Sequence, residues 1–370
     1  MDKNNCGKPQ FSGEWVRLGD VASYINGYAF KPADYASEGK PIIRIQDLTG
    51  NAYQTNRFAG NLDDKYRVVW GDVLISWSAS LGVYVWSAEE AWLNQHIFKV
   101  QFNKLPVNKR FFIHQTRYVI AESASLAHGA TMRHLTKKVF DNLPFFYPSE
   151  HDQEEIACHL DGIQLQIDSA SDMLARLDAL VKSRFIEMFG DPNSKQCKAF
   201  IEDAFFIRDD LRKPLSGIER DAMKTGELYP YYGANGKVDD INQFLTDCDA
   251  LCFAEDCGSY GPGEPTAYVI RGKAWVNNHA HLLVAKCPHF LEYARTYFTL
   301  LDVNRFISGT TRAKMTQAQL KKVNIEVPDQ VMLREFDGFV SNVDKLRFDV
   351  QQQIDKLELL KNSLMQEYFG

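Results

Sequence analysis

The sequence predicts an α+β fold in which two duplicated mixed α/β domains are joined by two long antiparallel coiled-coil helices. Three observations support this prediction: an internal repeat, short β-type runs in the first part of each half, and one long amphipathic stretch in the second part. A chain of 370 residues is too long for one core of ordinary size, so two cores are expected.

The internal repeat has a spacing of 180 residues and is aligned without a gap through the end of each half. Earlier in each half the spacing drifts by a few residues, and there Asn94-Gln95-His96 resembles Asn277-Asn278-His279. Such a spacing predicts a pseudo-two-fold duplication. The clearest matches are Gly129-Ala130-Thr131 with Gly309-Thr310-Thr311, Pro148 with Pro328, and Glu187-x-Phe189-Gly190 with Glu367-x-Phe369-Gly370.

Short apolar runs broken by Gly, Pro and Asn fill the first part of each half, and such runs are typical of strands. Examples are Asp72-Val73-Leu74-Ile75-Ser76 and Ala250-Leu251-Cys252-Phe253. Helical patches, such as 109–121 and 290–301, interrupt them. The first part of each half is therefore predicted to be a mixed α/β domain.

The second part of each half is predicted to be one helix of about 40 residues, roughly 60 Å long. Apolar residues recur there in a 4-3 rhythm that forms one narrow stripe, as in coiled coils. In the first helix the stripe is Ile156, Leu160, Ile163, Ile167, Leu174, Leu177 and Val181; in the second it is Val343, Leu346, Val350, Ile354, Leu357, Leu360 and Leu364. The stripes are expected to pack against each other as an antiparallel pair. The alternative is that each helix packs only on its own domain.

Charge is distributed unevenly along the chain. The net charge of −6 divides into +4 for 1–148, −6 for 149–190, −1 for 191–328 and −3 for 329–370. Acidic residues are thus concentrated in the two helices, and the larger segments permit binding to nucleic acid without requiring it. No apolar run is long enough to span a membrane and the N-terminus lacks a signal-peptide core, so a cytoplasmic protein is expected. The seven cysteines show no metal-ligand spacing, so no metal site is expected.

The order of several motifs resembles the specificity subunits of type I restriction-modification systems over essentially the whole chain. The first half contributes Gly71-Asp72-Val73-Leu74-Ile75-Ser76 and the run Pro148-Ser149-Glu150-His151-Asp152-Gln153-Glu154-Glu155-Ile156-Ala157. The second half contributes Tyr229-Pro230-Tyr231-Tyr232-Gly233-Ala234-Asn235-Gly236. One departure is the start of the second helix, 329–335, which matches the first copy only loosely. Because of this difference, the resemblance does not imply that partner subunits dock with equal strength at the starts of the two helices.

This resemblance implies target recognition domains at 1–148 and 191–328, with spacer helices at 149–190 and 329–370. It implies binding to double-stranded DNA at a bipartite, asymmetric site, and docking of two modification subunits, through which restriction subunits join the complex. The subunit itself would have no catalytic residues and no cofactor. S-adenosylmethionine, ATP and Mg would be bound by the partner subunits.

Candidate DNA-binding residues are hydrogen-bonding, aromatic and basic side chains in predicted loops, because base edges require directional donors and acceptors and phosphates require cations. Ordinary core packing of the aromatic residues and solvation of the cations remain alternatives. The candidates are Tyr28, Lys31, Arg44, Trp77, Ser78, Arg133 and Lys137 in the first half, and Tyr231, Tyr232, Asn235, Lys237, Ser259, Tyr260, Arg312 and Lys314 in the second.

An enzyme is disfavoured because the sequence has no phosphate-binding loop of the Gly-x-x-x-x-Gly-Lys-[Ser/Thr] type and no Asn-Pro-Pro-Tyr type segment for holding a flipped base. A non-catalytic coiled-coil scaffold that binds proteins and not DNA stays open, because the basic surplus is small.

Overall fold

Two compact units make up the computed structural model, which describes residues 11–50, 54–78, 80–126, 136–194, 199–256, 260–307 and 313–370. Unit 1 comprises Met1–Ser169 with Ile354–Gly370, and unit 2 comprises Ala170–Gln353. The long helices α5 (Glu150–Phe189) and α10 (Gln330–Phe369) each contribute to both units. The units therefore cut across the four consecutive segments expected from the sequence. Within the described ranges, no helix is both long and apolar enough to cross a membrane.

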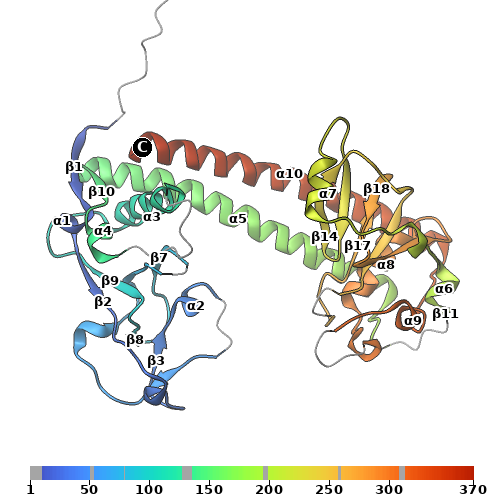
Figure 1. Ribbon diagram of the computed structural model, residues 1–370, viewed down its shortest axis with the longest axis horizontal. Helices are drawn as coiled ribbons and strands as arrows, with labels where there is room; N and C mark the ends of the chain where they lie inside the picture. The colour runs from blue at the N-terminus through green and yellow to red at the C-terminus, as the bar shows by residue number, and fades with distance from the viewer. Residues whose placement is uncertain are drawn as a thin grey trace, which may run out of the picture. The chain divides into compact units, whose positions relative to one another are not determined.

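Unit 1 contains a four-stranded antiparallel sheet of order β2-β9-β6-β7, a second sheet of order β4-β3-β8-β5 in which β3 and β8 are parallel, and an antiparallel β1-β10 pair (Figure 1). The strands are β1 (Gly13–Arg17), β2 (Ser23–Asn26), β3 (Lys40–Ile43), β4 (Arg57–Phe58), β5 (Arg67–Val68), β6 (Val73–Ser76), β7 (Gly82–Val85), β8 (Ala91–Leu93), β9 (Ile97–Gln101) and β10 (Pro144–Pro148). The helices are α1 (Leu18–Val21), α2 (Ile45–Leu48), α3 (Lys109–Leu126) and α4 (Lys137–Asp141), with 3-10 turns η1 (Pro32–Asp34) and η2 (Asp64–Tyr66).

Unit 2 repeats this topology sheet by sheet: β12-β19-β16-β17, β14-β13-β18-β15 and β11-β20. The strands are β11 (Ala199–Phe200), β12 (Phe205–Ile207), β13 (Tyr229–Gly233), β14 (Gly236–Ile241), β15 (Thr246–Asp247), β16 (Ala250–Ala254), β17 (Ala267–Ile270), β18 (Lys273–Val276), β19 (Ala280–Ala285) and β20 (Asn324–Ile325). The helices are α6 (Ile201–Ala204), α7 (Gly217–Ala222), α8 (Phe290–Leu300) and α9 (Gln317–Leu320), with η3 (Asp209–Leu211) and η4 (Asn304–Phe306). The α+β class and the duplication are confirmed.

Each unit builds its main core from one mixed domain, the start of one long helix and the end of the other. In unit 1, Ile156 and Leu160 of α5 join Tyr368 and Phe369 of α10 against Phe111 of α3. In unit 2 the corresponding residues are Leu333 and Phe336 of α10, Phe185 and Phe189 of α5, and Tyr293 of α8. The long helices thus pack on the domains as well as on each other.

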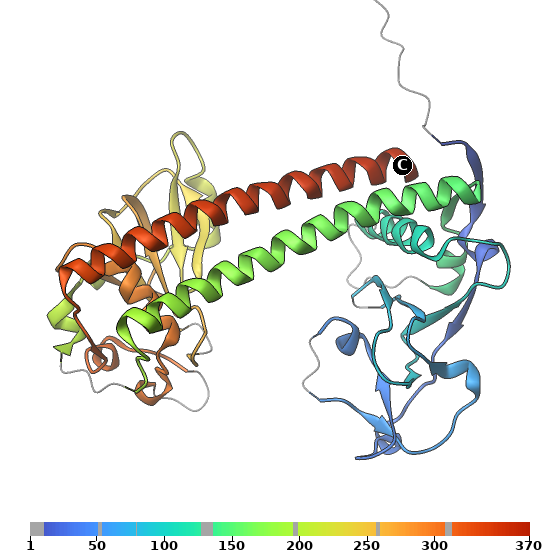
Figure 2. The same ribbon diagram turned by 180° about the vertical axis from the view of Figure 1, so that it is seen from behind.

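The two long helices are paired and antiparallel within each unit (Figure 2). In unit 1, Lys361 of α10 donates to Gln164 of α5 at 2.5 Å, and the Tyr368 hydroxyl lies 3.3 Å from His159. In unit 2, Arg347 pairs with Asp178 at 2.6 Å. Arg184 also pairs with Glu335, at 2.6 Å. Eight predicted stripe residues are buried, and four others are half-buried: Leu174, Leu177, Leu357 and Leu364.

Two predicted members of the stripe, Leu346 and Leu360, are wrong. Leu346 is 54% exposed, and the seam position beside it is taken by Arg347, whose stem is half-buried while its guanidinium pairs with α5. Lys361 likewise faces α5 beside the exposed Leu360. The heptad therefore continues through two cations. The long aliphatic parts of Arg and Lys cover apolar surface while their charged groups contact polar partners. A prediction from hydrophobicity alone therefore assigns the neighbouring leucine to the seam in place of the cation.

The seam can be tested by placing a charge at two positions of α10 in unit 2. Val343→Asp should lower the free energy of unfolding by about 3 kcal/mol or more, because it buries an unpaired carboxylate at a site that is 3% exposed. Leu346→Asp should stay within about 0.5 kcal/mol of the parent chain. Chemical denaturation measures both. Equal losses would contradict this placement of the seam.

Candidate nucleic-acid interface

The same turn follows the central strand in both units. After β6, the backbone N–H of Trp77 donates to His96 O at 3.4 Å; after β16, the N–H of Glu255 donates to His279 O at 2.8 Å. The strand registers agree, because Ser76 pairs with Ile97 as Ala254 pairs with Ala280. Trp77 and Glu255 therefore hold equivalent positions in the duplicated fold, and so do His96 and His279.

In unit 1 this position is occupied by an aromatic cluster. The ring of Trp77 stacks on Phe98, with 5.8 Å between the ring centroids, and contacts His96, with 5.4 Å between the centroids. Its indole Nε1 donates to Asn26 Oδ1 at 3.3 Å. Trp77 is half-buried and Asn26 is exposed, so the cluster presents a ring edge and hydrogen-bonding groups at the surface. Such groups suit stacking and base-edge contacts.

In unit 2 the equivalent position is occupied by an ionic network. Glu255 pairs with Arg212 at 2.8 Å and with Lys314 at 2.9 Å. Asp209, which follows β12 at the start of η3, pairs with Arg212 at 2.9 Å. Beneath them lies His281, the counterpart of Phe98, which is 1% exposed. The fold is shared, whereas the chemistry at the turn is different.

His281 has both ring nitrogens beside acceptors. Nδ1 lies 2.7 Å from Asp209 Oδ2, and Nε2 lies 2.8 Å from the carbonyl oxygen of Met315. The Met315 carbonyl oxygen can only accept, so Nε2 donates to it. The buried ring thus links η3, β19 and the segment before α9.

The carboxylates of this network are held in their charged form. Burial alone would raise the pKa of Asp209, but hydrogen bonding and charge from His281, with the charge of Arg212, lower it overall. Burial acts in the same way on Glu255, and hydrogen bonds from Arg212 and Lys314 lower its pKa. Both Arg212 and Lys314 therefore pair with Glu255. Lys314 remains exposed to solvent, so its ammonium group is also accessible to a phosphate.

In the repeated segments Asn94-Gln95-His96 and Asn277-Asn278-His279, the asparagine stabilises the turn and the histidine lies at the surface. Asn277 Oδ1 accepts from the His279 N–H at 2.8 Å, and Asn94 Oδ1 accepts from the Gln95 N–H at 2.6 Å, so both asparagines fix the turn itself. The side chain of His279 stays 46% exposed, with Nδ1 2.9 Å from Asp256. His279 is thus a candidate site residue that the sequence-based selection omitted; its place in the repeat was the available signal.

Predicted site residues that keep accessible surface occur in both units. Several cations among them are already paired: Arg44 with Asp47 at 3.2 Å, Lys137 with Asp141 at 2.8 Å and Lys237 with Asp240 at 2.9 Å. Tyr232 stacks on Tyr268 at 5.6 Å. The exposed or half-buried predicted residues are Tyr28, Lys31, Arg44, Trp77, Lys137, Tyr232, Asn235, Lys237 and Lys314.

Three predicted residues are core residues and are withdrawn as candidates for DNA contact. Tyr231 and Tyr260 are each 1% exposed, and Ser78 is 6% exposed. The Tyr231 hydroxyl accepts from the Leu215 N–H, and the Tyr260 hydroxyl donates to Glu255 O at 2.6 Å. Their polar tips serve the fold, as buried tyrosines generally require. Arg133, Ser259 and Arg312 lie outside the described residues.

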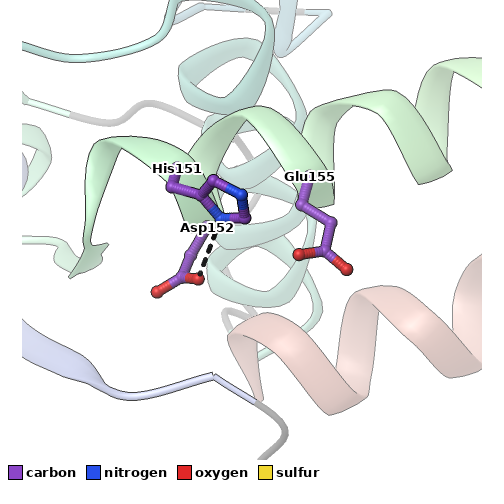
Figure 3. Close-up of side chains that lie close together, drawn as sticks. All are labelled: His151, Asp152 and Glu155. Carbon is purple, nitrogen blue, oxygen red and sulfur yellow. Dashed lines mark ion pairs between the residues drawn. The ribbon is translucent and has the colours of Figure 1, made fainter.

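One group of side chains in the described ranges has ligand atoms close enough to hold a metal ion: His151, Asp152 and Glu155, in the first turns of α5 (Figure 3). His151 and Glu155 are exposed. The positive end of the helix dipole disfavours a cation there, and the Ser149 hydroxyl accepts from the Asp152 N–H at 3.2 Å as a helix cap. Helix capping therefore accounts for these acidic residues.

In unit 2, burial raises the pKa of Cys252 to about 12, which keeps its side chain a thiol at neutral pH.

The family model described as type I restriction modification DNA specificity domain matches residues 13–178 and 216–363 of this chain. Each matched stretch falls within one half of the repeat.

Two curated relatives are similar over part of their length. The EcoBI type I restriction enzyme specificity subunit of Escherichia coli is 27% identical over 187 residues, which are 49% of this chain and 39% of that protein. A type I restriction enzyme specificity subunit of Haemophilus influenzae is 28% identical over 147 residues, 39% of this chain and 36% of that protein. The alignments thus span less than two fifths of these relatives.

Two solved structures share the fold over nearly the full chain. The type I restriction-modification S subunit from M. genitalium has a TM-score of 0.56 and 13% identity, and the match covers 100% of this chain and 98% of that one. A chain from a study of complex assembly and conformational transition in the type I R-M system has a TM-score of 0.53 and 13% identity, with 97% and 98% covered.

The ionic network predicts an acid-labile unit 2. Because the folded-state pKa values of Asp209 and Glu255 are lowered, their stabilisation is present above the unfolded-state pKa of about 4 and is lost as pH falls through the lower folded-state values. Asp209→Asn should therefore destabilise the chain at pH 7 and show a smaller further loss on acidification. Urea unfolding from neutral to acidic pH measures this.

The matched control is Asp221→Asn, at an exposed position of α7 in the same unit. This variant should keep the acid dependence of the parent chain. An Asp209→Asn profile parallel to the parent's at every pH would contradict the proposed charge state.

Proposed function

Because this chain belongs to the type I restriction-modification DNA specificity family, we propose that it is the non-catalytic subunit that recognises a bipartite, asymmetric site on double-stranded DNA. Residues 1–148 and 191–328 are proposed as the two target recognition domains, and 149–190 and 329–370 as spacer helices. The chain would act in the cytoplasm, and it would direct modification and restriction subunits to the site it binds.

The observation that supports an asymmetric site is the pair of equivalent turns with different side chains. Trp77, His96 and Asn26 offer an aromatic face with amide and imidazole groups. Glu255 and Lys314, at the equivalent place in unit 2, offer paired charges. Base edges are distinguished by donor and acceptor patterns and by apolar contact, so these two surfaces are suited to different half-motifs.

Chemistry would be supplied by partner subunits. We propose two modification subunits that use S-adenosylmethionine to methylate adenine, and restriction subunits that use ATP and Mg to cleave DNA. The chain itself would contribute no cofactor. Its contribution would be binding and positioning, which places the reactive subunits relative to the two half-motifs.

The decisive experiment combines the full chain with a modification subunit and maps methylated adenines. Two short motifs separated by a fixed, unspecified gap are expected. Trp77→Ala should weaken selection of one half-motif by about 1–3 kcal/mol and leave the other unchanged. Trp70→Ala, in the same unit at a site 76% exposed, should leave both unchanged. A continuous site would contradict the proposal, and absent DNA binding would favour a protein scaffold.

The gap is predicted to depend on helix length. Inserting seven residues into both α5 and α10, near Ser169 and Gln353, keeps the heptad phase and lengthens each helix by ~10 Å. With base pairs ~3.4 Å apart, the gap should grow by about three base pairs while both half-motifs persist. Methylation mapping measures the gap.

Insertion into α5 alone is the control, because it shifts the seam out of register and should lower stability. An unchanged gap in the double insertion, with methylation retained, would contradict the spacer role of the helices.

A further inference from the structure

A pocket of about 430 Å³ lies within unit 1 between α3 and the C-terminal part of α10. Both walls are helical and belong to the same compact unit. Nothing in the proposed reading of base edges uses this pocket. Its lining residues are His114, Arg117, Tyr118, Ala121, Glu122, Lys361, Asn362, Met365 and Gln366.

Three of the lining side chains are basic and lie close enough to influence one another. Burial, followed by the charge of Arg117, lowers the pKa of Lys361, although the charges of Asp168 and Glu358 oppose this shift. Burial lowers the pKa of His114 too, and the charges of Arg117 and Lys361 add to that effect although Asp161 opposes it. Mutual repulsion of this kind indicates positive charges gathered on one pocket.

These cations are held by neutral partners. The Nε and Nη2 atoms of Arg117 both donate to the carbonyl oxygen of Val83, at 3.1 and 3.0 Å. Lys361 donates to the amide oxygen of Gln164 at 2.5 Å. In the described part of the chain, neither cation forms an ion pair with a carboxylate, whereas Asp161 is engaged by Arg110 and His114. Glu122 lines the pocket but is exposed to solvent.

Lys361 is half-buried and Arg117 is exposed. Desolvation disfavours the charge of Lys361, and an anion bound beside it would offset that cost. The two cations in one concave site make a phosphate or similar anion a favourable occupant. Asn362 and Gln366 add amide donors, and Tyr118 and Met365 add apolar contact. This mixture of a few convergent polar groups on an apolar wall is typical of ligand sites.

The position in unit 2 that the repeat makes equivalent to Lys361, at the offset of 180 residues, is the apolar Val181. A different pocket of unit 2, of about 760 Å³, lies against α8 and the first half of α10, and its cations Arg271 and Lys345 share it with carboxylates of Glu292, Asp337, Asp344 and Asp349. Arg271 pairs with Glu292 at 2.8 Å. The positive charge of Lys361 is therefore a property of the sequence in unit 1 and not a consequence of the shared fold.

We propose that the pocket between α3 and α10 in unit 1 binds a phosphate group through Arg117 and Lys361. The group belongs either to a free phosphate compound or to the DNA backbone. The site is separate from the turn at Trp77, so it adds a contact to unit 1 that base recognition does not require.

The test titrates the full chain with inorganic phosphate and follows binding by calorimetry, with chloride at equal ionic strength as reference. Lys361→Gln should weaken phosphate binding by about tenfold or more. Lys356→Gln, on an exposed face of the same helix and in the same unit, should not change it. Unchanged thermal unfolding in chloride shows that both variants are folded. Arg117→Lys, which keeps the charge, should retain part of the affinity.

Phosphate binding that is absent in the parent chain, or equal in the Lys361→Gln and Lys356→Gln variants, would overturn the proposal. A second arm titrates duplex DNA. If Lys361→Gln reduces the slope of affinity against salt by about one, the phosphate belongs to the backbone. If DNA binding is unchanged while inorganic phosphate binding is lost, the ligand is a free anion. Methylation mapping is not used, so the bipartite proposal can fail independently.

Discussion

Burial of the narrow stripes on α5 and α10 is the constraint on which the rest of the structure depends. A helix of 40 residues with one apolar face cannot remain solvated on that face, and most of its stability comes from tertiary packing. In each unit the start of one long helix and the end of the other pack against the mixed domain. Phe185 and Phe336 do so in unit 2, as Ile156 and Phe369 do in unit 1. The pairing is therefore part of each core and not an appendage to it.

Duplication fixes the scaffold and leaves the turns free to diverge. The strand orders of the two units match, and the N–H that follows the central strand donates to the same carbonyl position. The backbone, by contrast, does not determine the side chain at that position. An indole in unit 1 and a carboxylate in unit 2 are both accommodated, because their neighbours, Phe98 and His281, changed with them. The side chains at the turn can therefore vary while the strands that support the turn stay the same.

The repeat and the helix stripes were predictable because both are local patterns of fixed period. The site was less predictable, because its members come from distant parts of the chain. Asp209, Glu255 and His281 have no shared spacing, and only the sheet register brings them together. The sequence also did not indicate which side chains are buried. Tyr260 follows a glycine-containing segment that is typical of a loop, yet its ring belongs to the core. At Leu346 the error has another cause, since a cation with a polar partner occupied the seam beside it.

The two turns also differ in how firmly they are organised before a ligand arrives. The indole of Trp77 is held by a ring contact with Phe98 and a hydrogen bond to Asn26. Lys314 is held by Glu255, which is itself fixed by Arg212, and below them His281 ties Asp209 to the Met315 carbonyl. A charge fixed in this way loses less conformational entropy on binding, but it must exchange its ion pair with Glu255 for a new one. Contacts that a ligand makes with unit 2 would therefore contribute more to its orientation than to its binding affinity. On the stacking surface of unit 1, the buried apolar area would instead increase the affinity.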